Sequence, residues 1–319
     1  MRILIAGAGA TGGGYGARLI EAGRDVTFLV RPRRAEVLTR DGLTLDAPDG
    51  RRTLRVNAVT VIEAGDHYDL LIVAVKAPAL AEVLNTAAPA IGPKTMILPV
   101  LNGMDHLDAL QTKYPGQVLG GLVKIVATLD EAGAVLQMTP LSTMTIGTLD
   151  GSPLKADIPE ALNVPGIELT VDGAIVTRLW EKWAFIASAG VITCLFRGNI
   201  GDIIAAGGEE HILRAIAETE EVARIAGHPV SATSHAQAIG LLTEQGSSFT
   251  SSLYRDLRHG DPVEAEHILG GLAARARKLH VATPLLDATL LQMRTHHRAL
   301  EREHADTSGR GILINDAER

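Results

Sequence analysis

The sequence predicts an α/β protein in which an N-terminal domain with a parallel β-sheet precedes a second, all-helical domain. Short β-branched runs alternate with Ala-rich helical stretches over residues 1–171, which is typical of strand–helix–strand units. Beyond Asp172, a candidate helix N-cap, apolar residues recur at helical spacing almost to Leu300. The 319-residue chain also exceeds the length that one hydrophobic core usually serves. We therefore expect domains at 1–171 and 172–319, with a mobile tail from about residue 304.

The strands of the first domain are expected in a definite order. Runs that read as parallel strands, the later ones apolar enough to be covered on both faces, lie at 2–6, 25–30, 69–75 and 95–100. A turn at Pro48-Asp49-Gly50 between two short alternating runs predicts a hairpin. Residues 120–147 are rich in strand formers, and we expect them to extend the same sheet with antiparallel strands before a last strand at 167–171.

Composition excludes several classes of protein. A net charge of −7 argues against binding to a phosphate backbone. The single cysteine, Cys194, excludes an internal disulfide, and the 11 histidines form no pattern typical of a metal site. The chain enters a strand directly after Met1-Arg2, and no uncharged run approaches the length of a membrane span. We expect a cytoplasmic monomer or homodimer with no metal and no nucleic-acid or membrane partner.

A glycine-rich turn follows the first strand and opens a helix. The pattern G-x-G-x-x-G in this context is the fingerprint of a dinucleotide-binding, Rossmann-type domain. Its glycines allow a tight turn, close approach of a pyrophosphate and close helix–strand packing, while the helix N-terminus offers free N–H donors. The predicted contacts are Gly7, Ala8, Gly9, Ala10, Thr11 and Gly12.

The end of the second strand indicates which dinucleotide is bound. NAD-specific domains usually place an acidic residue there, to bind the ribose 2′-hydroxyl. Here the strand is followed by Arg31, Arg33 and Arg34, and guanidinium groups suit a 2′-phosphate. The sequence therefore favours NADP(H), against the alternative of a solvated basic turn.

Two further polar residues follow predicted strands. Lys76 comes after the strand at 69–75, and Asn102 after the strand at 95–100. Ligands of open α/β sheets bind outside the carboxyl ends of the strands. Lysine suits phosphate or carboxylate, and asparagine suits nicotinamide or substrate, so we expect both residues at the cofactor crevice.

Several segments together resemble the ketopantoate reductase (2-dehydropantoate 2-reductase) family. They are GAGATGG at 7–13, VKAPAL at 75–80, LNGMDH at 101–106, LWEKWAF at 179–185, SSLYRD at 251–256 and VEAE at 263–266. They occur in family order over nearly the whole chain. The resemblance implies a Rossmann domain joined to a helical domain, with an active site between them, and an NADPH-dependent enzyme that reduces a 2-oxo acid to a 2-hydroxy acid.

The resemblance also implies roles for individual residues. Lys182 matches the lysine that protonates the substrate oxygen, and Glu264 a glutamate near that lysine and the nicotinamide. Ser252 matches a serine that holds the substrate carboxylate. Asn102 matches an asparagine touching both cofactor and substrate, Lys76 a lysine at the cofactor cleft, and Arg31 the arginine of the 2′-phosphate. A positioned ammonium both stabilises and protonates the charge that hydride addition puts on the oxygen.

One departure from the family concerns the substrate. Family members carry asparagines four and eight residues after the catalytic lysine, where this chain has Ile186 and Gly190. The three positions share one helical face, so both changes remove polarity beside Lys182. The leading reaction is ketopantoate to pantoate, in pantothenate biosynthesis. The alternatives are a paralogous reductase of a less polar 2-oxo acid and a non-catalytic NADP(H)-binding sensor.

Overall fold

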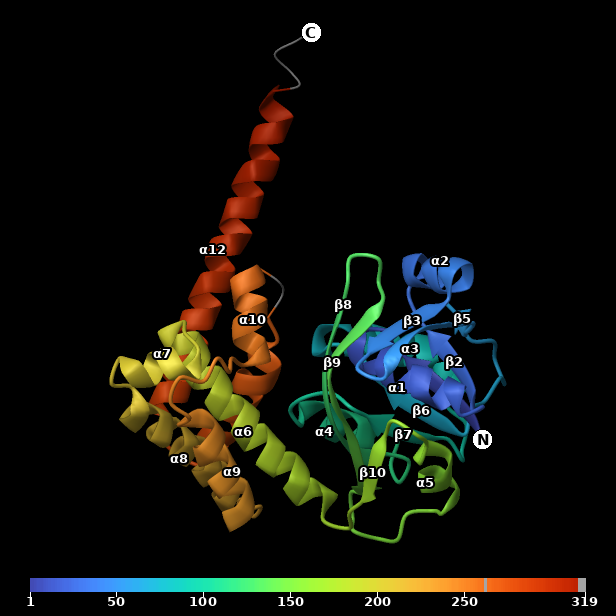
Figure 1. The fold of residues 1–319 in the computed structure, drawn as a ribbon, viewed down its shortest axis with the longest axis horizontal. Helices are drawn as coiled ribbons and strands as arrows, with labels where there is room; N and C mark the ends of the chain where they lie inside the picture. Colours follow the sequence, from blue (N-terminus) through green and yellow to red (C-terminus); the bar gives the residue numbers. More distant parts are fainter. Residues whose placement is uncertain (261–262, 315–319) are drawn as a thin grey trace. The chain divides into compact units, whose positions relative to one another are not determined.

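The computed structural model describes the backbone of residues 1–260 and 263–314, and the side chains of these residues as far as 302. Contacts divide the chain into two compact units, Met1–Leu179 and Trp180–Arg319, each of which is described by itself. Figure 1 shows that the first unit holds both β-sheets, whereas the described part of the second consists of helices and their connections. The predicted α/β domain followed by a helical domain is confirmed.

A five-stranded parallel sheet forms the base of the first unit. Its strands, in spatial order, are β5 (Asn57–Val59), β2 (Asp25–Leu29), β1 (Arg2–Ala6), β6 (Leu70–Val73) and β7 (Met96–Pro99). The strands of its centre are almost wholly buried, as expected for parallel strands covered on both faces. The helices after these strands are α1 (Ala10–Glu21), α2 (Pro32–Asp41), α3 (Leu80–Ala87) and α4 (Asp105–Lys113), followed later by α5 (Asp157–Leu162).

The remaining strands form a second sheet, which corrects one expectation. The predicted hairpin is present as β3 (Leu43–Ala47) and β4 (Gly50–Leu54). The strands β8 (Leu119–Leu129) and β9 (Val135–Thr148) do pair antiparallel, but β9 joins β3 and β10 (Glu168–Val171) instead of extending the parallel sheet. The expectation of a single extended sheet was wrong because strand patterning predicts extended backbone but not the partner strand.

The helix α1 packs between the two sheets, and its glycines make this possible. A Cβ at Gly16 would overlap Phe28 of the parallel sheet, and a Cβ at Gly13 would lie 2.8 Å from Val135 of the second sheet. The phenol of Tyr15, in the same helix, is buried and donates to the carbonyl of Thr143 at 2.7 Å. Burial raises the pKa of this phenol, which stays neutral.

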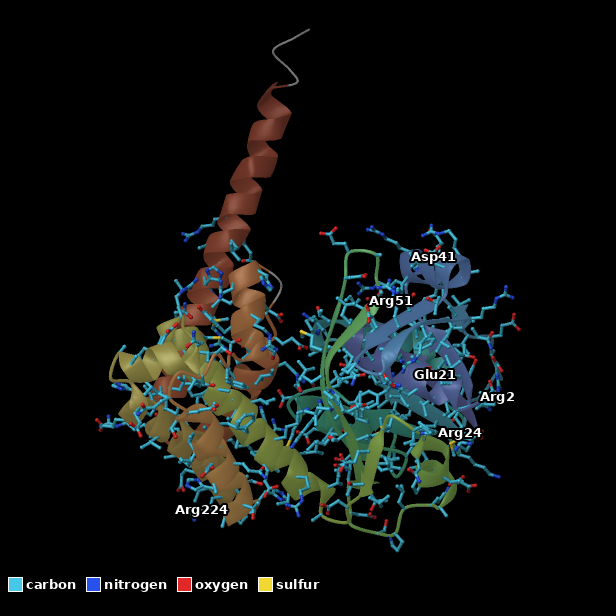
Figure 2. The ribbon with its side chains drawn as sticks, viewed as in Figure 1. Arg2, Glu21, Arg24, Asp41, Arg51 and Arg224 are labelled. Carbon is cyan, nitrogen blue, oxygen red and sulfur yellow. The ribbon has the colours of Figure 1, made fainter. Side chains whose placement is uncertain are left out.

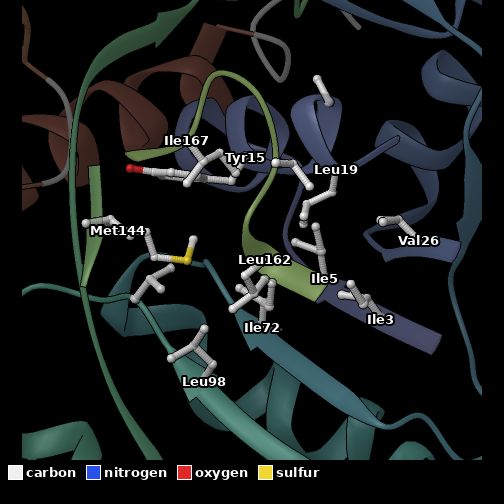
Figure 3. Close-up of a cluster of buried hydrophobic side chains, with 14 of the residues drawn as sticks. Ile3, Ile5, Tyr15, Leu19, Val26, Ile72, Leu98, Met144, Leu162 and Ile167 are labelled. Atoms are coloured by element: carbon white, nitrogen blue, oxygen red, sulfur yellow. The ribbon is translucent and has the colours of Figure 1, made fainter. Parts of the chain in front are cut away.

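The core of the first unit joins residues of both sheets around α1, as Figure 3 shows. The labelled members are Ile3, Ile5, Tyr15, Leu19, Val26, Ile72, Leu98, Met144, Leu162 and Ile167. Arg24, labelled in Figure 2, attaches α5 to this body by donating to the carbonyls of Ala161 (3.0 Å) and Glu160 (2.8 Å). The second sheet is therefore a fixed part of the first unit.

The second unit is built around α6 (Ile175–Phe196), most of which is buried. Asp172, the predicted N-cap, accepts from the Ala174 amide at 2.7 Å and from Arg178 at 2.8 Å, just before the helix begins. The helices that follow are α7 (Ile200–Ala205), α8 (Glu209–Ile225), α9 (Ala232–Leu242), α10 (Ser252–His259), a π-helical turn (Glu266–Gly270), α11 (Gly271–Lys278) and α12 (Pro284–Ile314).

Two features of these helices bear on the sequence analysis. By length and composition, α6 is the one helix in the described chain that could cross a membrane, but 72% of its most apolar window is buried, as in a core helix. The helix α12 continues to Ile314, past residue 304, where an aperiodic tail was expected. The mobility of that tail remains a prediction, and residues 315–319 lie outside the described chain.

Candidate active site

Four predicted cofactor-binding elements lie at one edge of the parallel sheet. The strands β2, β1, β6 and β7 are neighbours in that order and run parallel, so their carboxyl ends share an edge. Arg31, the glycine-rich turn, Lys76 and Asn102 each follow one of them. Chain order reverses direction across β1 and β6, and open α/β sheets bind ligands at such a point.

The glycine-rich turn has the shape that a pyrophosphate needs. Gly7 has φ +104°, and a Cβ there would lie 2.9 Å from the Ala74 carbonyl oxygen. A Cβ at Gly12 would overlap the Gly7 carbonyl oxygen, whereas a Cβ at Gly9 would meet open space. Gly9 is the N-cap of α1, and no described side chain caps that helix end. The turn therefore leaves room and N–H donors for a dinucleotide, which fits the residues present.

Arg31 is the N-cap residue of α2 and is 71% exposed. Its Nη2 lies 2.9 Å from Oε2 of Glu82 in α3, whose side chain is 65% exposed. An exposed ion pair of this kind contributes little to stability and is readily exchanged for another anion. Arg31 is therefore held at the end of β2 by a weak partner that another anion can displace.

Lys76 and Asn102 differ in their exposure. Lys76 is exposed and precedes a short 3₁₀ turn (Ala77–Ala79). Pro78 lies at the start of this turn, where an N–H would have no helical partner, so the missing proline N–H costs nothing. Asn102 is half-buried and is followed by Gly103 at φ +76°, a turn that aims the chain into α4. The structure thus brings these two residues to the edge that carries the glycine-rich turn, while their roles in binding remain predictions.

On the second unit, α6 presents Lys182, Ile186 and Gly190 on one helical face. Lys182 and Ile186 are half-buried, and Gly190 is buried. Trp183, the next residue, is 1% exposed and lies under the Arg275 guanidinium at 4.8 Å. Lys182 therefore lies at the more exposed edge of this face, about 100° around the helix from the buried Trp183.

Ser252 is the first residue of α10 and is exposed. The preceding Ser251 caps this helix, with its Oγ accepting from the Tyr254 amide at 3.1 Å. The Ser251 hydroxyl also lies 2.6 Å from the hydroxyl of Thr193 in α6. This buried pair fixes the start of α10, and hence Ser252, to the helix that carries Lys182.

Glu264 lies just before the π-helical turn, and its carbonyl accepts from the Ile268 amide at 3.1 Å. The carbonyl of Ile268 in turn accepts from Nε1 of Trp183 at 2.8 Å, a buried hydrogen bond. Isolated π-turns recur at functional sites because they alter the direction of side chains within a helix. The segment that carries Glu264 is therefore bonded to α6 at the residue next to Lys182.

Two neighbours of these residues could not be foreseen from the sequence. Glu82 is separated from Arg31 by 51 positions, and Leu253 fills the space beside Gly190, with its Cδ1 2.8 Å from the position of a Cβ there. No linear pattern connects either pair. Among the side chains that the structure describes, no three His, Cys, Asp or Glu residues are grouped as metal ligands.

Comparison with protein families matches both parts of the chain that carry the predicted site residues. The model described as "Ketopantoate reductase PanE/ApbA" matches residues 3–151, and "Ketopantoate reductase PanE/ApbA C terminal" matches residues 174–296. The chain belongs to the ketopantoate reductase family. It is thus an oxidoreductase, and the resemblance seen in the sequence is confirmed.

Individual members of the family resemble the chain over most of its length. It is 32% identical over 300 residues to "Uncharacterized oxidoreductase YkpB" of Bacillus subtilis, covering 93% of this chain and 99% of that protein. It is 29% identical over 297 residues to a 2-dehydropantoate 2-reductase of Halobacterium salinarum, covering 90% and 95%.

Solved structures share the fold. The crystal structure of 2-dehydropantoate 2-reductase from Methylococcus capsulatus aligns with a TM-score of 0.81 at 24% identity, covering 94% of this chain and 97% of that one. The ternary structure of D-mandelate dehydrogenase with NADH and anilino(oxo)acetate aligns with a TM-score of 0.83 at 21% identity, covering 94% and 100%. These identities establish similarity of fold alone.

Proposed function

We propose that this oxidoreductase uses NADPH to reduce the keto group of a 2-oxo acid. The observation that carries the proposal is that one helix, α6, bears Lys182 and is bonded to the segments of both Ser252 and Glu264. The helix α6 thereby connects a proton donor (Lys182), a hydroxyl for the substrate carboxylate (Ser252) and a carboxylate for the lysine (Glu264). Arg31 at the end of β2, with no acidic residue in its place, supports NADPH over NADH.

Each residue then has a defined task. A bound reduced nicotinamide supplies the hydride that adds to C2 of the acid. Lys182 donates a hydrogen bond to the 2-oxo oxygen and transfers its proton there as the C–O π bond becomes a lone pair, which yields the 2-hydroxy acid. Ser252 donates to the substrate carboxylate from the N-terminal turn of α10, where the helix dipole also favours an anion. Glu264, on the segment bonded to α6, orients the lysine.

The leading substrate is ketopantoate, which would be reduced to pantoate. Asn102, at the carboxyl edge of the parallel sheet, is proposed to bridge cofactor and substrate through its amide. Lys76, exposed at the same edge, supplies a positive charge to the cofactor phosphates. These assignments follow the pattern of the family to which the chain belongs.

A specific observation favours a second candidate, a less polar 2-oxo acid. The position equivalent to a family asparagine is Gly190, and the space that its side chain would need is taken by Leu253 and Leu269. With Ile186 on the same face, this wall offers no partner to a substrate hydroxyl, and a buried hydroxyl without a partner costs about 1–3 kcal/mol.

The experiment that tests the proposal follows NADPH absorbance with ketopantoate and with a series of apolar 2-oxo acids. Replacing Lys182→Ala is expected to lower kcat/KM by a factor of about 10²–10⁴. Lys278→Ala, which removes an exposed lysine from the end of α11, serves as the matched control and leaves the rate unchanged. Turnover of no acid by a protein that binds NADPH would support the non-catalytic sensor instead.

A further inference from the structure

The side chain of Arg34 reaches back from α2 to the glycine-rich turn. Its Nε donates to the carbonyl oxygen of Ala8 at 3.2 Å. Ala8 is the second residue of the turn and is 4% exposed. Arg33, the neighbouring basic residue, is exposed to solvent, so the two arginines of this turn have different surroundings.

The tip of the β8–β9 hairpin lies near α2 (Figure 1), and its Gly133 lies against the Arg34 guanidinium. Gly133 at this tip has φ +84°, and a Cβ added to it would overlap Nη1 of Arg34. The tip is itself fixed by Asp130, whose Oδ1 accepts from the Ala134 amide at 2.7 Å. Burial lowers the pKa of Arg34, and the nearby Asp130 charge opposes this shift.

One nitrogen of this guanidinium is left without a partner. Nη2 of Arg34 is buried and makes no hydrogen bond with the residues that the structure describes. A buried donor of this kind has a cost, which a structural role in the core would ordinarily avoid. The cost is incurred beside the glycine-rich turn, which points to a role of this side chain at that turn.

The bond to Ala8 determines which way the next peptide N–H points. In a trans peptide the carbonyl of one residue and the N–H of the next point in opposite directions. With the Ala8 carbonyl held by Arg34, the Gly9 N–H is directed away from α2. Gly9 is where the space above the turn is open and where α1 begins.

We propose that Arg34, clamped between Ala8 and the hairpin glycine Gly133, is a positioning residue that aims the Gly9 N–H at the pyrophosphate of the dinucleotide. The inference rests on the proposed function in that it takes a nicotinamide dinucleotide as the ligand. It goes beyond it by assigning the β8–β9 hairpin a part in cofactor affinity. Because the pyrophosphate is common to NADPH and NADH, Arg34 acts equally on both, unlike a residue that contacts the 2′-phosphate.

The first test measures dissociation constants for NADPH and NADH directly, by quenching of protein fluorescence. Arg34→Gln removes the Ala8 bond and is expected to weaken both cofactors by the same factor, about tenfold for one lost charged hydrogen bond. Arg40→Gln is the matched control, because it removes the same charge from an exposed position at the far end of α2. At saturating cofactor, kcat is unchanged, since Arg34 does not touch the nicotinamide.

A second variant leaves the charge in place and keeps the test decisive if Arg34→Gln folds poorly. Gly133→Ala adds a methyl group that displaces the guanidinium, and it is expected to weaken both cofactors equally. Gly116→Ala is its control, because Gly116 has a similar φ of +76° but nothing within 4 Å of an added Cβ. Backbone strain is thus matched, and only the contact with Arg34 differs.

The outcomes separate the two proposals. A loss confined to NADPH, or no greater loss than in the controls, would overturn the positioning role while leaving the reductase proposal intact. A wild-type protein that binds neither cofactor would overturn both. An equal loss for NADPH and NADH in Arg34→Gln and Gly133→Ala, absent from Arg40→Gln and Gly116→Ala, supports the inference.

Discussion

Leu253 occupies the space that a side chain at Gly190 would need: its Cδ1 lies 2.8 Å from the position of a Cβ on that glycine. Both residues are buried, and Leu253 directly follows Ser252, the proposed carboxylate-binding residue. The face of α6 that carries Lys182 is therefore packed at position 190 by an apolar side chain from α10.

This contact predicts how position 190 responds to substitution. Gly190→Asn is expected to destabilise the protein by about 1–3 kcal/mol, because overpacking forces Leu253 from its place. Adding Leu253→Ala makes room, so the double variant should be more stable than the sum of the two single changes. Urea unfolding of all four proteins measures this coupling. Additive losses would show that the two side chains do not compete.

Position 186 predicts a change in substrate preference. Ile186 is half-buried on the face of α6 that carries Lys182. Because a large side chain already occupies this position, unlike position 190, Ile186→Asn restores a polar group without overpacking. We expect the ratio of kcat/KM for ketopantoate to that for an apolar 2-oxo acid to rise about 5- to 20-fold. Ile186→Val, which stays apolar, is the control. An unchanged ratio in the asparagine variant would place the substrate side chain elsewhere.

Substituting the two partners of the Arg31–Glu82 ion pair is expected to change NADPH affinity in opposite directions. Arg31→Gln is expected to weaken NADPH about tenfold or more and to leave NADH nearly unchanged, because the 2′-phosphate loses a charged partner. Glu82→Gln frees Arg31 and removes a repelling charge, so NADPH affinity should rise by about two- to fivefold at low salt and less at high salt. Titration of both variants with both dinucleotides checks the signs.

The hydrogen bond from Trp183 to Ile268 predicts a link between α6 and the Glu264 segment. Trp183→Phe removes the 2.8 Å bond and leaves a buried carbonyl without this donor, which is expected to cost about 1–3 kcal/mol. We also expect faster amide exchange in residues 264–270. Trp180→Phe, at the neighbouring indole, should leave exchange in that segment unchanged.

The environment of Cys194 predicts the pH dependence of its reactivity. Burial raises the pKa of this thiol to about 12, so the folded protein keeps it protonated throughout the neutral range. An unfolded thiol ionises near pH 8.5, so alkaline pH above that value favours the unfolded state at this group. A thiol reagent at pH 8 should modify the native protein slowly and the urea-unfolded protein at once. Rapid native labelling would contradict the burial.

Much of the fold could be predicted because local residue patterns specify strands and helices. The apolar runs that became β1, β6 and β7, and the glycine-rich turn between β1 and α1, depend on neighbouring residues alone. The pairing of β9 could not be predicted. It joins β3, about 90 positions away, at Leu45 and Val135, and that choice depends on how the strands pack over the glycine face of α1.

By itself the sequence determined the order of elements, the dinucleotide turn, the basic end of β2 and the family to which the chain belongs. Only the tertiary structure decided that Arg31 pairs with Glu82, that Leu253 covers Gly190 and that Arg34 bonds to Ala8. The physical reason is one of range. Patterns and turns are set by contacts a few residues apart, whereas side-chain neighbours across elements depend on the packing of the whole unit.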